Sequence, residues 1–204
     1  MNSLELGGGW SVEWAVADRA LQEESGDLHV VAPFDGGVVV AVIDGLGHGP
    51  EAAHAARGAA TVVTANAGAP LDSLLRGCHD ALHHTRGVAM SVACFATADG
   101  SLSWSGIGNV EALLARADPA APRARESLAT RGGVLGFQIP TPHVSTLDVR
   151  SGDVLVFATD GIRSGFEATL DIRKEPRAAA KAILDAHRRE TDDALVLFAR
   201  FLSA

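Results

Sequence analysis

Four acidic positions stand beside apolar runs, and their residue type and placement make them the first candidates for chemistry. Asp44 and Asp160 each end an apolar, strand-like run and precede a glycine. Asp27 and the pair Asp192-Asp193 each stand immediately before another such run. Strand ends that lie at one edge of a fold bring their side chains together, so we predict that these acids share one site.

Carboxylates gathered at one edge repel one another and must be neutralised by protonation, basic neighbours or cations. Few Lys or Arg residues flank these positions in the sequence. Hard divalent cations such as Mg²⁺ and Mn²⁺ prefer oxygen ligands. The pattern therefore predicts a metal site. An isolated Asp-Gly at a strand end is more often a turn than a ligand, so the prediction depends on the recurrence of the pattern.

Strands must position these acids, and the apolar pattern predicts where they lie. Trp10–Val16 alternates apolar and polar residues, and Leu28–Ala32 and Val38–Ile43 form a hairpin around Asp35-Gly36-Gly37. Further strand-like runs are Ser91–Thr97, Ser101–Ser105, Val110–Arg116, Arg125–Ala129, Val144–Val149, Val154–Ala158 and Ala194–Phe201.

Three helices are expected between these strands. Pro50–Ala65 begins with a proline that is tolerated at a first helical position, and Leu71–His84 and Pro176–Arg188 show helical apolar spacing. Strands separated by turns, with helices inserted late or in pairs, favour antiparallel pairing over a repeated strand-helix-strand unit. We predict an α+β fold of stacked antiparallel sheets covered by helices.

Length and composition narrow the class of protein. The 204 residues are expected to form one domain, residues 1–204. The formal charge of −8 argues against binding to nucleic acid or to anionic membranes. No run reaches the roughly 18 apolar residues of a spanning helix and the start does not resemble a signal peptide, so we expect a cytoplasmic protein. We also expect a monomer, with Cys78 and Cys94 as reduced structural thiols.

The acidic motifs resemble those of the bacterial metal-dependent Ser/Thr protein phosphatases of the PPM superfamily, in the SpoIIE branch. The resemblance runs nearly end to end and keeps the family order. It implies a four-layer αββα sandwich of two antiparallel sheets flanked by helices, with a two-metal centre at one end. The motifs that carry it are Ser25-Gly26-Asp27, Asp44-Gly45-Leu46-Gly47-His48-Gly49, Ala158-Thr159-Asp160-Gly161-Ile162 and Asp192-Asp193-Ala194-Leu195.

The resemblance also implies roles for single residues. Asp44 would bridge two divalent cations, Mn²⁺ or Mg²⁺, and the Gly45 carbonyl would ligate one of them. Asp160 and Asp192 would hold the other, and Asp27 would anchor metal-bound waters. Catalysis would then be the attack of a metal-bridging water on a phosphoester, with Asp44 and Asp160 acting through that water.

The segments Gly106–Glu111 and Arg131–Phe137 resemble the stand-alone stress-response phosphatases of this branch. This likeness implies a phosphorylated regulatory protein as substrate, a STAS-domain or stressosome component. Two other classes stay open: a PPM-fold binding module that has lost turnover, and a phosphoesterase that acts on a small molecule. A protein substrate needs a broad open face around the site, whereas a metabolite needs a closed pocket.

The sequence departs from the pattern of the larger superfamily members at three positions. Leu46 stands where they carry a His that protonates the leaving alkoxide, and His48 is the alternative candidate for that role. Gln22 stands where they carry a phosphate-binding Arg, and Asn109 where relatives carry an Asp of a third metal site. We therefore expect two metals rather than three.

Other reactive side chains are interpreted as structural. Neither Ser25 nor Cys94 has a recognisable base partner for nucleophilic catalysis. His79 and His83 stand four apart and suggest zinc, but with His84 they offer no third type of ligand in register, so a solvated helix face is preferred.

Overall fold

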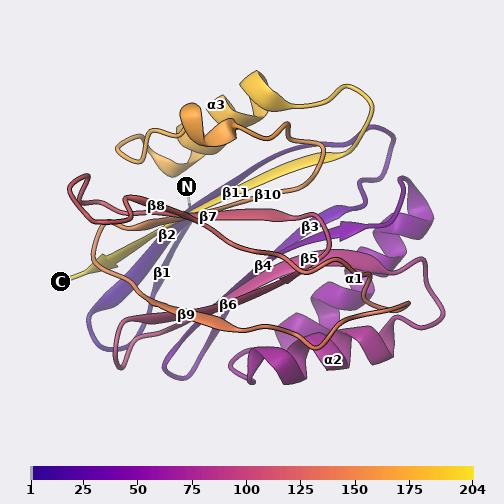
Figure 1. The fold of residues 1–204 in the computed structure, drawn as a ribbon, viewed down its shortest axis with the longest axis horizontal. Helices are drawn as coiled ribbons and strands as arrows, with labels where there is room; N and C mark the ends of the chain where they lie inside the picture. The colour runs from indigo at the N-terminus through magenta and orange to yellow at the C-terminus, as the bar shows by residue number, and fades with distance from the viewer. Residues whose placement is uncertain (1) are drawn as a thin grey trace.

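The computed structural model describes residues 2–204 and places the strands in two packed sheets (Figure 1). One sheet has the strand order β1 (Asn2–Glu5), β2 (Trp10–Arg19), β11 (Ala194–Ser203), β10 (Val154–Ala158), β7 (Glu111–Ala115), β8 (Arg125–Ser127). The other has the order β3 (Asp27–Phe34), β4 (Gly37–Gly45), β5 (Val88–Ala96), β6 (Ser101–Ile107), β9 (Ser145–Asp148). Every pair of neighbouring strands is antiparallel, as the sequence predicted.

Helices cover the two outer faces of this pair of sheets. Helices α1 (Pro50–Ala65) and α2 (Leu71–Ala81) pack on the five-stranded sheet, and α3 (Pro176–His187) packs on the six-stranded sheet, close to the short 3₁₀ helix η1 (Phe166–Ala168). Figure 1 shows α3 on one side of the sheets and α1 and α2 on the other. The four-layer αββα sandwich is confirmed.

The strands that lead to the acids are buried on both faces. In β4 the even-numbered residues Val38 to Val42 pack between the sheets, whereas the odd-numbered residues Val39 to Ile43 pack against α1 and α2. Residues of β10 and β11 divide in the same way between the inter-sheet core and α3. This two-sided burial explains why these strands read as unbroken apolar runs rather than as alternating ones.

Several elements differ from the sequence expectation: β2 extends to Arg19, β5 begins at Val88, and η1 was not expected. The helix that begins at Leu71 ends at Ala81, not at His84, because Leu82 leaves the helical region and its N–H turns back to the carbonyl of His79. The edge strand Asn2–Glu5 was not expected, since its sequence carries no apolar alternation and only its pairing with β2 makes it a strand.

Cys78 is buried, Cys94 is partly buried, and both are free thiols. Within residues 2–204, no helix is both long enough and apolar enough to cross a bilayer.

Candidate metal centre

Two of the four acidic positions lie side by side in the five-stranded sheet. Asp27 opens β3 and Asp44 ends β4, and the two residues are direct partners in the antiparallel pairing. Direct partners in such a pair point to the same face of the sheet. Asp44 continues the even-numbered residues of β4, so this face is the one that meets the other sheet.

The other acids come from the facing sheet. Asp160 follows β10, and Asp192 and Asp193 precede β11, the strand that pairs with β10. The hydroxyl of Thr159 links the sheets, because it donates to Asp27 Oδ2 at 2.7 Å and accepts the N–H of Leu195 at 2.9 Å. Four strand ends, two from each sheet, therefore meet at one end of the sandwich.

Burial and mutual repulsion raise the pKa values of the two inner acids. Desolvation is the largest cause for both. It raises the pKa of Asp27 to about 7, against the lowering effect of the Thr159 hydrogen bond and with further repulsion from Asp193, Asp160 and Asp192. Desolvation raises the pKa of Asp44 to about 8, together with repulsion from Asp27, Asp160, Asp192 and Asp193, in decreasing order of effect. The acids are therefore close enough to feel one another's charge.

Asp160 occupies the outer part of the cluster and is exposed. Partial desolvation of its carboxylate and then repulsion from Asp192 raise the pKa of Asp160. The charge of Arg189 and a hydrogen bond from Asn109 lower it. Asn109 Nδ2 donates to Asp160 Oδ2 at 2.7 Å. An aspartate at position 109 would have no proton to donate when ionised.

No described Lys or Arg is ion-paired with the four acids, as the scarcity of basic residues around them in the sequence suggested, although the charge of Arg189 acts on Asp160. Within residues 2–204, no Lys or Arg forms an ion pair with Asp27, Asp44, Asp160 or Asp192. In the same residues, no three acids of the cluster offer oxygens that all lie within 4.8 Å of one another. One small ion does not reach three of these carboxylates at their present positions. The oxygen-only donor set, spread around a wider volume, fits hard cations that retain water ligands.

The glycines that follow Asp44 and Asp160 allow close packing. Neither Gly45 nor Gly161 has a positive φ angle. A Cβ on Gly45 would lie 2.2 Å from the carbonyl oxygen of Ala52 in α1, and a Cβ on Gly161 would lie 1.8 Å from that of Asp193. The Asp-Gly pairs are therefore places where a second backbone approaches the strand end, and Asp160-Gly161 also form a turn that the N–H of Ile162 closes on the carbonyl of Thr159 at 3.0 Å.

Of the adjacent acids before β11, Asp193 is committed to the backbone. It is 3% exposed, and its two oxygens accept the N–H groups of Leu21 and Gly26, each at 2.7 Å. Asp193 thereby fixes the segment between β2 and β3 that leads into Asp27. Asp192 is half-buried, and one of its oxygens accepts the N–H of Asp193 at 2.9 Å.

The remaining sequence candidates lie at the rim. His48 is exposed on the loop after Gly45, and Leu46 on the same loop is 38% exposed. Gln22 is exposed and lies against Gly49, where an added Cβ would meet its Oε1 at 2.8 Å. The Ser25 hydroxyl accepts the N–H of Asp27 at 3.1 Å, a turn-forming contact.

Sequence reasoning missed three residues of this centre. Thr159 was part of a quoted motif but was given no role, and nothing in its spacing indicated that it would bridge the sheets. Asn109 was noted for the acid it replaces, not as a donor to Asp160. Arg189 was not considered for the site, but its charge acts on Asp160 and its N–H donates to the Gly161 carbonyl at 2.7 Å.

Comparison with solved structures identifies the fold. One similar chain comes from work on the bacterial stressosome, described as a modular system that has been adapted to control secondary messenger signalling. It is 26% identical, with a TM-score of 0.83, and the match covers 93% of this chain and 99% of that chain. RsbX in complex with magnesium is 18% identical with a TM-score of 0.79, over 98% of each chain. The phosphatase domain of SpoIIE from Bacillus subtilis is 16% identical with a TM-score of 0.75, over 96% of this chain and 64% of that chain.

Comparison by sequence identifies the family. No curated protein matches this chain at a significant level. The family of stage II sporulation protein E (SpoIIE) matches residues 35–202, which include Asp44, Asp160 and Asp192 but not Asp27. This match spans most of the chain and agrees with the αββα fold and with the two PPM-type phosphatase structures. The chain therefore belongs to the SpoIIE family, in the PPM superfamily of phosphatases.

Proposed function

We propose that residues 1–204 act as one metal-dependent phosphatase domain that removes phosphate from Ser or Thr of a small regulatory protein. The observation that carries this proposal is the convergence of Asp27, Asp44, Asp160 and Asp192 from four strand ends, without a Lys or Arg partner among residues 2–204. Family membership supports the same chemistry.

We propose that these residues share two divalent cations, Mn²⁺ or Mg²⁺, as the resemblance implies. Asp44 would bind both ions. The Gly45 carbonyl would bind one of them, and Asp160 and Asp192 would bind the other. Asp27 would hold water ligands. When bound, such ions supply an activated water near neutral pH and stabilise the charge of a phosphoryl group. That RsbX was solved with magnesium supports this choice of ion.

The chain's own contribution is to hold these acids in place before any ion arrives. Thr159 fixes the rotamer of Asp27 across the sheets, and Asn109 fixes that of Asp160. Asp193 fastens the segment that precedes Asp27. Such supporting hydrogen bonds orient metal ligands and spare the ion the cost of gathering them.

The surroundings of the centre favour a protein substrate over a metabolite. Asp160 is exposed, and two apolar side chains at the rim also face solvent: Leu46 is 38% exposed and Phe137 is 82% exposed. Phe137 follows Leu135, which pairs with Val88, the strand partner of Gly45, so β5 separates this loop from the end of β4. Exposed apolar groups around an open site are what a protein partner can cover.

A phosphorylated STAS-domain or stressosome component fits this face as the substrate. The likeness to RsbX and to a chain from the bacterial stressosome supports this substrate class. We also propose that the protein acts in the cytoplasm as a monomer, and that His48, exposed on the loop after Gly45, donates the proton to the leaving alkoxide.

The first test is metal-dependent hydrolysis of p-nitrophenyl phosphate by the full chain. We expect Mn²⁺ to stimulate it, EDTA to abolish it, and Asp44→Asn or Asp160→Asn to remove it without loss of folding by circular dichroism. Asp148→Asn is the matched control, because Asp148 also ends a strand but lies at the opposite end of the five-stranded sheet. Full activity of both centre variants would refute the assignment.

The raised pKa values predict how stability depends on pH. The pKa of Asp44 rises from 3.8 to about 8 on folding, so its contribution to stability is present at low pH and is lost as pH rises through that interval. We expect Mn²⁺ to raise Tm more at pH 8 than at pH 5.5. Metal-free Asp44→Asn should be more stable than wild type at pH 8.

Thermal unfolding in EDTA and in Mn²⁺ at the two pH values checks this prediction, with Asp148→Asn as control. A gain from Mn²⁺ that is equal at both pH values, or that persists in Asp44→Asn, would contradict it.

The role of His48 can be tested by comparing leaving groups. Nitrophenolate departs without protonation, whereas a serine alkoxide needs a proton. His48→Ala should therefore lower the rate on a phosphoserine protein by about 10²-fold or more, as expected for loss of a general acid, and have much less effect on p-nitrophenyl phosphate. The control is His54→Ala, at an exposed position of α1. Equal effects on both substrates would exclude the role.

Phe137→Ala tests whether the apolar rim binds a protein. A central aromatic contact contributes more than about 1 kcal/mol at interfaces, so kcat/KM for phospho-STAS proteins should fall at least about fivefold, and by more than for p-nitrophenyl phosphate. Val144→Ala, at an apolar residue that is 37% exposed, is the control. Phosphate release from metabolites alone would instead support a small-molecule phosphoesterase, and no release from any substrate would support a binding module.

A further inference from the structure

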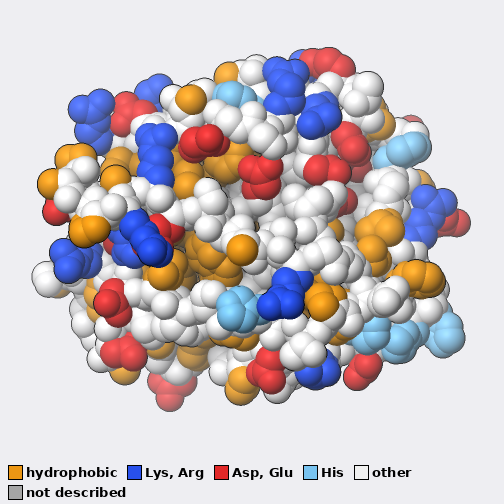
Figure 2. Space-filling view, in the orientation of Figure 1, with side chains coloured by type: hydrophobic (Ala, Val, Ile, Leu, Met, Phe, Trp, Pro, Cys, Tyr) orange, Lys and Arg blue, Asp and Glu red, His pale blue; other side chains and the backbone are white. Residues whose placement is uncertain are grey.

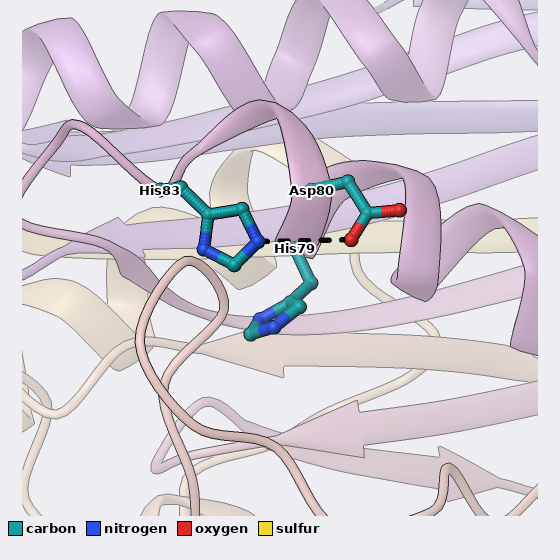
Figure 3. Close-up of side chains that lie close together, drawn as sticks. All are labelled: His79, Asp80 and His83. Atoms are coloured by element: carbon teal, nitrogen blue, oxygen red, sulfur yellow. Dashed lines mark ion pairs between the residues drawn. The ribbon is translucent and has the colours of Figure 1, made fainter.

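The C-terminal end of α2 carries a second group of metal-ligand side chains, His79, Asp80 and His83 (Figure 3). Each offers one ligand atom, and the three atoms all lie within 4.8 Å of one another. Within residues 2–204, this is the one such group of three or more His, Cys, Asp or Glu side chains. The sequence expectation that no third ligand type stands in register was wrong, because Asp80 and His83 are three residues apart and lie on one side of the chain.

Small side-chain movements suffice to close this group around an ion. Ligands at about 2.0–2.1 Å in a tetrahedron stand roughly 3.4 Å apart. His83 Nε2 already lies 3.8 Å from Asp80 Oδ1, and the ring centroids of His79 and His83 are 4.7 Å apart. The side chains of His83 and Asp80 are 50% and 76% exposed, so both are free to rotate. Figure 3 shows the three side chains gathered beside the helix end.

Charge around the group also favours a cation. The last carbonyls of a helix carry partial negative charge, and His79 and Asp80 stand in the last turn of α2. Asp80 adds a full negative charge, and its only ion-pair partner in residues 2–204 is His83. Figure 2 shows several histidine side chains together on the side of the molecule that carries α1 and α2.

We propose that His79, Asp80 and His83 form a second metal site that binds Zn²⁺ or another late first-row transition metal ion. Two imidazoles and one carboxylate are the donors that such ions prefer. The centre built from Asp27, Asp44, Asp160 and Asp192 offers only oxygen and suits Mg²⁺ or Mn²⁺. The two sites therefore differ in donor chemistry and are separable by the choice of ion.

Binding at His79 has a defined structural consequence. The N–H of Gly136 donates to Nδ1 of His79 at 3.1 Å, and a neutral imidazole has a single lone pair to give. An ion that takes this lone pair displaces Gly136, at a cost of about fivefold in affinity. Leu135, next to Gly136, pairs with Val88, the strand partner of Gly45. Occupancy of this site is therefore expected to move the backbone at Gly136, next to Leu135.

The experiment is a titration of the untagged full chain with Zn²⁺, in saturating Mg²⁺ to occupy the acidic centre. Binding is measured by calorimetry and by ¹H–¹⁵N spectra of the backbone amides and imidazoles. We expect one Zn²⁺ per chain, with shifts at the His79 and His83 rings and at the Gly136 amide. His79→Ala and His83→Ala should each weaken Zn²⁺ binding about tenfold or more, because loss of a residue that only hydrogen-bonds to a metal ligand already lowers metal affinity about tenfold or more.

Two controls separate this site from the acidic centre and from general surface binding. His84→Ala removes an exposed neighbour outside the group and should leave Zn²⁺ affinity unchanged. Asp44→Asn should retain the site, so this inference and the proposed phosphatase activity can fail independently. Wild-type affinity in both His79→Ala and His83→Ala, or Zn²⁺ shifts confined to the acidic centre, would overturn the proposal.

Discussion

The structure depends on holding mutually repelling carboxylates together at the end of an apolar sandwich. Asp27 and Asp44 are direct strand partners, and burial with like charge raises both pKa values into the range of 7 to 8. Strands buried on both faces cannot shift or splay to relieve this repulsion without exposing their cores. The sandwich therefore supplies the stability that keeps the acids close together.

Several polar side chains stabilise this arrangement without being placed to hold an ion. Thr159 joins the two sheets at Asp27, Asn109 holds Asp160, and Asp193 uses both oxygens on backbone N–H groups. The glycines after Asp44 and Asp160 let α1 and the start of β11 approach the strand ends. Positioning by packing and hydrogen bonds thus precedes any binding of metal. The group at the end of α2 differs, because the side chains of Asp80 and His83 are exposed, whereas His79 accepts a hydrogen bond from Gly136.

Particular residues mark how far sequence reasoning reached. Helix α1 has the bounds that its proline, acidic first turn and alanine-rich face predicted, because these are local signals. The end of α2 was set too late, since the turn at Leu82 depends on contacts that no local pattern encodes. Thr159 escaped notice because its partner Asp27 is 132 residues away in the sequence. Asp80 was overlooked although His79 and His83 stand within three residues of it.

The sequence by itself determined the αββα class, the family, and which acids stand at strand ends, because period, turn chemistry and motif order are properties of the chain. Only the tertiary structure decided that Asp27 faces Asp44, that Asp193 serves the backbone, and that Asn109 and Arg189 flank Asp160. Those relations depend on strand register and on the stacking of one sheet on the other. A shift of one residue in β4 would turn Asp44 away from the facing sheet. The short turn between Phe34 and Gly37 fixes the pairing of β3 with β4 locally, whereas the approach of Asp160 and Asp192 depends on contacts between the two sheets.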